Sequence, residues 1–75
     1  MEISKNHRRK IACHSLSVGS MQYAMMVVHL QDGFVSYISY LDGEEPSTEW
    51  LPGTIKIERD TNGRWIASYR GNRLC

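Results

Sequence analysis

Long apolar runs, clustered cysteines and glycine-rich phosphate loops are all missing from this 75-residue sequence. No stretch reaches the roughly 18 apolar residues that a membrane-spanning helix needs, so we expect no membrane contact. Residues 1–10 are basic, but no apolar core of a signal peptide follows them. These absences favour a cytoplasmic protein.

Cysteine is scarce as well, with Cys13 and Cys75 as the only two. One possible bridge to the last residue is a poor disulfide framework, because chain ends tend to fray. Reduced thiols are the rule in cytosolic proteins. We therefore interpret Cys13 as a small buried hydrophobe within a strand.

The residue spacings that hold metals or build nucleophiles are also absent. Only His7, His14 and His29 could supply imidazole, and neither His-x-His nor Cys-x-x-Cys occurs. Pairing of the first two strands could bring His14 and His29 close, with Cys13 nearby. Cys13 and His14 point to opposite faces of a strand and cannot form a nucleophile–base pair, whereas Cys13 with His29 stays open. We predict no metal, no cofactor, no catalytic residue and no enzymatic activity.

What the sequence does contain is an apolar centre, residues 21–41. Two β-branched and aromatic runs flank Asp32-Gly33, and this turn signal predicts a β-hairpin. Simple alternation places apolar side chains on both faces of both strands. In the first strand it separates Ala24, Met26, Val28 and Leu30 from Tyr23, Met25, Val27 and His29. In the second strand it separates Phe34, Ser36, Ile38 and Tyr40 from Val35, Tyr37, Ser39 and Leu41.

Further strands are predicted on either side of this hairpin. Residues 10–18 form a strand with Ala12, His14, Leu16 and Val18 on one face. Residues 54–59 and 64–70 form two more, preceded by a type II turn at Pro52-Gly53. The predicted fold is all-β: an antiparallel meander of about five strands, closed as a small barrel or half-sandwich. A flexible basic arm (1–9), one domain (10–70) and a tail (71–75) make up the chain.

Two functions follow from this pattern. Either a closed barrel or sandwich covers both apolar faces of the hairpin, or a partner covers one of them. So short a chain has little to cover them with, which favours a protein–protein interaction module, in the simplest case a homo-oligomer. The predicted interface residues are Tyr23, Met25, Val27, Tyr37 and Trp50. The alternative is a small nucleic-acid-binding barrel with exposed aromatics. Its predicted phosphate contacts lie in the basic arm: Lys5, Arg8, Arg9 and Lys10.

One pattern resembles a known family. The segment Val27-Val-His-Leu-Gln-Asp-Gly-Phe-Val-Ser-Tyr-Ile, with the later Leu51-Pro-Gly-Thr-Ile, is similar to the small β-sandwich domain that flanks the barrel of amidohydrolases. The resemblance covers roughly residues 24–57 and consists of turn motifs. Where the family has a metal-binding His-x-His, this sequence has Ile55-Lys56-Ile57, and no barrel follows. The resemblance therefore implies a free-standing β module without hydrolase activity.

Overall fold

The computed structural model describes residues 8–43 and 46–75, and these residues form one six-stranded sheet. No helix occurs among them, so none is present that could cross a membrane. The all-β class predicted from the sequence is confirmed. The strands are β1 (Arg8–Val18), β2 (Met21–Gln31), β3 (Phe34–Tyr40), β4 (Glu49–Arg59), β5 (Trp65–Tyr69) and β6 (Asn72–Leu74).

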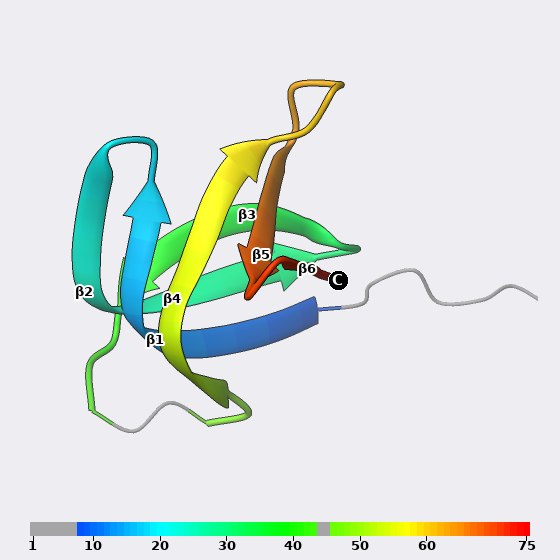
Figure 1. Ribbon diagram of the computed structural model, residues 1–75. Helices are drawn as coiled ribbons and strands as arrows, with labels where there is room; N and C mark the ends of the chain where they lie inside the picture. The colour runs from blue at the N-terminus through cyan, green and yellow to red at the C-terminus, as the bar shows by residue number, and fades with distance from the viewer. Residues whose placement is uncertain (1–7, 44–45) are drawn as a thin grey trace, which may run out of the picture.

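The strands are ordered β3-β2-β1-β4-β5-β6. The predicted meander holds for β1 to β3, which pair as antiparallel neighbours. β4 then crosses over and pairs with β1 in parallel, before β5 and β6 resume antiparallel pairing. The sheet curls strongly, so that β3 and β5 approach each other although four strand positions separate them (Figure 1). The result is a half-barrel, in agreement with the predicted small barrel.

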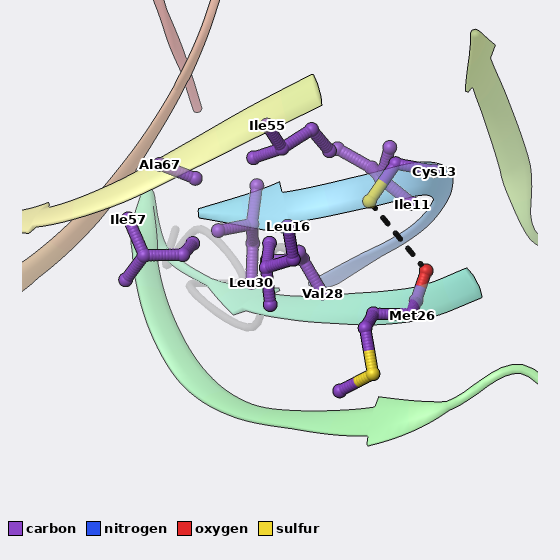
Figure 2. Close-up of a cluster of buried hydrophobic side chains, with 9 residues drawn as sticks. All are labelled: Ile11, Cys13, Leu16, Met26, Val28, Leu30, Ile55, Ile57 and Ala67. Carbon is purple, nitrogen blue, oxygen red and sulfur yellow. Dashed lines mark hydrogen bonds between the residues drawn. The ribbon is translucent and has the colours of Figure 1, made fainter. Parts of the chain in front are cut away.

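The inner face of the curled sheet holds the hydrophobic core (Figure 2). Side chains from β1, β2, β4 and β5 meet there, and most of them are completely buried. Cys13 is one of them, and its thiol donates to the carbonyl oxygen of Met26 at 3.7 Å. Cys13 and Cys75 are both free thiols, the first buried and the second exposed. The core cluster consists of Ile11, Cys13, Leu16, Met26, Val28, Leu30, Ile55, Ile57 and Ala67.

β1 and β2 both change face at the same point. Cys13 and Leu16 both face the core although they are three positions apart, an odd spacing that alternation would place on opposite faces. The same holds for Tyr23 and Met26 on the paired strand. Met25, at this point of β2, has a positive φ of 56°. Simple alternation was therefore wrong here: Ala12 does not share a face with Leu16, and Tyr23 does not share one with Val27.

A second departure from alternation occurs in β3. The predicted turn forms as expected, with φ of 54° at Asp32 and 88° at Gly33, the values of a type I′ hairpin. The register then shifts, because His29 pairs with Tyr37 but Leu30 pairs with Val35. Ser36 is the extra residue of this β-bulge. Val35 and Ile38 consequently both pack against the core, which corrects the predicted division of this strand.

The sequence predicted a type II turn at Pro52-Gly53. This prediction was wrong, because both residues lie inside β4. The register between β1 and β4 shifts at this point, so the pair forms a bulge opposite His14. Gly53 has a φ of 107°, its N–H donates to His14 Nδ1 at 3.3 Å, and the Tyr69 hydroxyl donates to the Pro52 carbonyl. Tertiary hydrogen bonds on both sides thus hold a sequence that resembles a free turn.

The predicted boundaries also move at both ends of the domain. β1 already begins at Arg8, while residues 1–7 of the predicted arm lie outside the described part of the chain. The predicted tail contains β6, and Arg73 Nη2 donates to the Gly33 carbonyl at 2.9 Å. The guanidinium carbons of Arg64 and Arg73 lie 3.4 and 4.8 Å from the centre of the Phe34 ring. Side chains thus join the two ends of the sheet.

Candidate interaction surface

The outer face of β1 to β4 carries a continuous set of small and large side chains. In one row across the sheet, Trp50, Ala12, Val27 and Ser39 are register partners from β4 to β3. Their chain neighbours Ile11, Val28, Ile38 and Leu51 face the core, so this row faces outward. We call the following residues the outer-face patch: Ala12, His14, Met25, Val27, His29, Tyr37, Ser39 and Trp50.

Burial within this patch is uneven. Ala12 and Val27 at its centre are 3% and 0% exposed, although they do not belong to the core cluster. Met25, Trp50 and Tyr37 around them remain 42%, 45% and 59% exposed. The patch thus combines a buried apolar centre with large side chains that keep much of their surface in solvent. A solvated face of an antiparallel sheet would instead be polar.

Aromatic and hydrogen-bond contacts hold the large side chains of the patch in place. The rings of His29 and Tyr37 stack at 4.0 Å between centroids, with 11° between their planes. His29 Nε2 lies 2.9 Å from the Ser39 hydroxyl oxygen. The His14 ring meets Trp50 edge-on at 4.7 Å. These contacts reduce the side-chain entropy that a binding partner would otherwise have to remove.

Three of the five predicted interface residues, Val27, Tyr37 and Trp50, lie in neighbouring register rows of the outer face. Met25 is 42% exposed and lies on β2 between Tyr23 and Met26, which both pack in the core. Tyr23 lies outside the patch, because the change of face in β2 turns it toward the core, where it is half-buried. Sequence reasoning did not assign His14, His29 and Ser39 to this surface. Alternation placed His29 on the same face as Val27, so His29 could have been predicted. His14 was harder to assign, because alternation grouped it with Leu16, which faces the core after β1 changes face.

A groove of about 530 Å³ adjoins the patch where β1 begins. Arg8, Arg9 and Lys10 of β1 line it together with His29 and Tyr37. No acidic side chain is among the described residues that line it. The groove thus combines three cations with a stacked aromatic pair, and we call it the basic groove.

The predicted phosphate contacts are divided by the structure. Arg9 forms a bidentate ion pair with Glu49, with both N···O distances at 2.7 Å. This pair raises the pKa of Arg9 and lowers the pKa of the Glu49 carboxyl. All three described residues of this set, Arg8, Arg9 and Lys10, line the basic groove, and the Arg9 guanidinium is bound to Glu49 there. Lys5 lies outside the described residues.

The candidate nucleophile and metal ligands do not come together. Burial raises the pKa of the Cys13 thiol, which keeps it protonated, and Cys13 is 0% exposed. The register places Lys10 opposite His29, four residues from His14, so the two histidines are not cross-strand neighbours. Within residues 8–43 and 46–75, no group of three or more His, Cys, Asp or Glu side chains could hold a metal ion.

Comparisons with known protein families, curated proteins and solved structures give no match to this chain. The likeness to the β-sandwich domain of amidohydrolases stays a prediction from the sequence.

Proposed function

We propose that this chain is a small cytoplasmic protein–protein interaction module without catalytic activity, and that it binds a second copy of itself through the outer-face patch. The observation that carries the proposal is the exposure of Met25, Tyr37 and Trp50 around a buried apolar centre. Homodimer interfaces are enriched in aromatic residues and methionine and depleted of charge at their centre. The buried, protonated Cys13 thiol supports the absence of nucleophilic catalysis.

The charges at the two ends of the patch favour a second copy as the partner. Arg8 and Lys10 lie at the end where β1 begins. At the opposite end β3 leads into the exposed Asp42. An isologous dimer places the same patch on both sides of a two-fold axis. With the strands of the two copies running in opposite directions, the basic end of each would meet the acidic end of the other.

The backbone at Met25 gives independent support. A left-handed conformation costs a non-glycine residue about 1–2 kcal/mol relative to its usual one. Met25 nevertheless adopts φ of 56°, and its side chain is exposed and contributes to the patch. Strain of this kind is often retained where a side chain must be presented for binding.

Sedimentation velocity in the micromolar range tests the proposal. The unsubstituted chain should form dimers, and Trp50→Ala should weaken them by about 2 kcal/mol, because tryptophans at the centre of an interface often carry most of the binding energy. Trp65→Ala is the matched control, since Trp65 lies on β5, outside the patch, with the Arg59 guanidinium 4.6 Å from its ring. A monomer throughout this range would contradict the proposal.

Two further variants separate association from folding. Met25→Gly relieves the left-handed strain, so it should weaken the dimer without lowering the free energy of unfolding of the monomer. Asp42→Lys should weaken the dimer by placing like charges together, and addition of Lys10→Asp should restore it. Failure of this exchange to restore the dimer would contradict the proposed arrangement of the two copies.

A further inference from the structure

We infer that the basic groove binds single-stranded nucleic acid, with a base stacked on Tyr37 and the adjoining phosphates on Arg8 and Lys10. This inference does not depend on self-association, because the groove is built within one chain. It deepens the nucleic-acid hypothesis from the sequence by naming the two cations and the ring that would make contact.

The Tyr37 ring offers a surface on which a base can stack. Lys10, His29 and Tyr37 form one register row across β1, β2 and β3. His29 covers one face of the Tyr37 ring at 4.0 Å, yet Tyr37 is still 59% exposed. The exposed area therefore includes the other ring face, which is available to continue the stack. Aromatic rings of this kind bind bases regardless of sequence, because every base has a π face.

Two cationic side chains lie on the same face of the sheet as the Tyr37 ring. Arg8 and Lys10 are two residues apart on one strand, so both lie on the side of the sheet that carries His29 and Tyr37. Arg9, between them, points to the other side and pairs with Glu49. Arg9 also lines the groove, but the Arg8 and Lys10 side chains are the two that share a face with the aromatic stack. Cations beside a stacking ring are the combination that single-strand-binding proteins use.

Size and chemistry favour a nucleotide over a small anion. The groove of about 530 Å³ is far larger than a phosphate group, and part of its wall is an aromatic surface that a phosphate would not use. An acidic peptide could engage the cations but has no planar group for the Tyr37 face. The base and phosphate of a nucleotide satisfy both parts of the groove.

Fluorescence anisotropy with a labelled oligouridine RNA tests the inference, at chain concentrations where sedimentation shows only monomer. Binding should weaken as salt rises, with a slope of about −0.7 for each phosphate contact. Arg8→Gln and Lys10→Gln should each reduce this slope by about one contact. Arg59→Gln removes a charge of the same sign outside the groove and should leave the slope unchanged.

Tyr37 provides the decisive variants. Tyr37→Ala should weaken RNA binding at least about fivefold, whereas Tyr37→Phe keeps the ring and should bind as the unsubstituted chain does. Absence of binding at low salt, or equal binding by the Tyr37→Ala variant, would overturn the inference. Displacement of the RNA by inorganic phosphate or by polyglutamate at equal concentration would overturn it too, in favour of a general anion site.

Discussion

Val27 and Val28 are adjacent in the chain and both are completely buried, yet they lie on opposite faces of the sheet. Val28 belongs to the core cluster on the inner face of the curled sheet, which also contains side chains of β1, β4 and β5 (Figure 2). Val27 is buried on the other face, outside this core cluster, in a row with the exposed Trp50. We expect the inner face to be the more tightly packed of the two, because its side chains form one continuous cluster.

The largest loss of stability is expected from a substitution of Leu16, on the inner face of the sheet. Leu16 is 0% exposed and lies in the core between β2 and β4. Leu16→Ala removes buried methyl groups and leaves a cavity, so we expect the free energy of unfolding to fall by about 2–5 kcal/mol. Urea denaturation measures this loss. A loss below about 1 kcal/mol would mean that the inner face is not the tightly packed one.

The valine pair itself provides the most direct comparison. Val28→Ala should lower the free energy of unfolding by about 2–3 kcal/mol, because it removes buried methyl groups and leaves a cavity within the core. Val27→Ala should cost about 1–1.5 kcal/mol, since the exposed neighbours on its face can move into the space. Urea midpoints of the two variants give the difference. Equal costs would show that the outer face is packed as firmly as the core.

The contacts that close the half-barrel should contribute less to the free energy of unfolding than the packing of either face does. Phe34→Leu keeps an apolar side chain but removes the ring beside the guanidinium groups of Arg64 and Arg73. Each exposed cation–π contact is worth about 0.5–1 kcal/mol, so we expect a loss near 1 kcal/mol in thermal unfolding. Trp65→Leu is the control, because it removes only the one cation–π contact with Arg59. The loss of stability from cation–π contacts should therefore be smaller in this variant. An unchanged melting temperature would show that these arginines do not join the sheet ends.

The smallest effect concerns the ion pair between Arg9 and Glu49, which holds the pKa of the Glu49 carboxyl below its usual range. A carboxyl with a lowered folded-state pKa stabilises the fold above its unfolded pKa and loses that contribution as pH falls through the folded value. Glu49→Gln should therefore cost at most about 1 kcal/mol at neutral pH, since the pair is partly exposed, and less at acidic pH.

Urea denaturation of this variant at neutral and acidic pH measures the change. Glu58→Gln removes a similar charge from β4 and is the matched control, because the Glu58 carboxylate lies 3.8 Å from the Lys56 ammonium. A cost of Glu49→Gln that grows toward acidic pH would contradict the assignment of the lowered pKa to this pair.

The candidate site could be predicted in part. Alternation placed Met25 and Val27 on one face of the hairpin, and the local turn signal correctly located Asp32-Gly33. Alternation failed for Tyr23, because the backbone at Met25 adopts a left-handed conformation. Methionine rarely adopts this conformation, so the sequence gives no sign of it. The pairing of the Arg9 guanidinium with Glu49, 40 residues away, was equally invisible.

The sequence by itself determined the all-β class, the hairpin and the alternation of β4, because these depend on neighbours within a few residues. Only the tertiary structure decided that β4 pairs in parallel with β1, that Pro52-Gly53 becomes a bulge, and that residues 72–74 form a strand. Each of these depends on backbone hydrogen bonds between segments far apart in the chain. The outer-face patch belongs to this second group, since the parallel pairing is what places Trp50 beside Ala12.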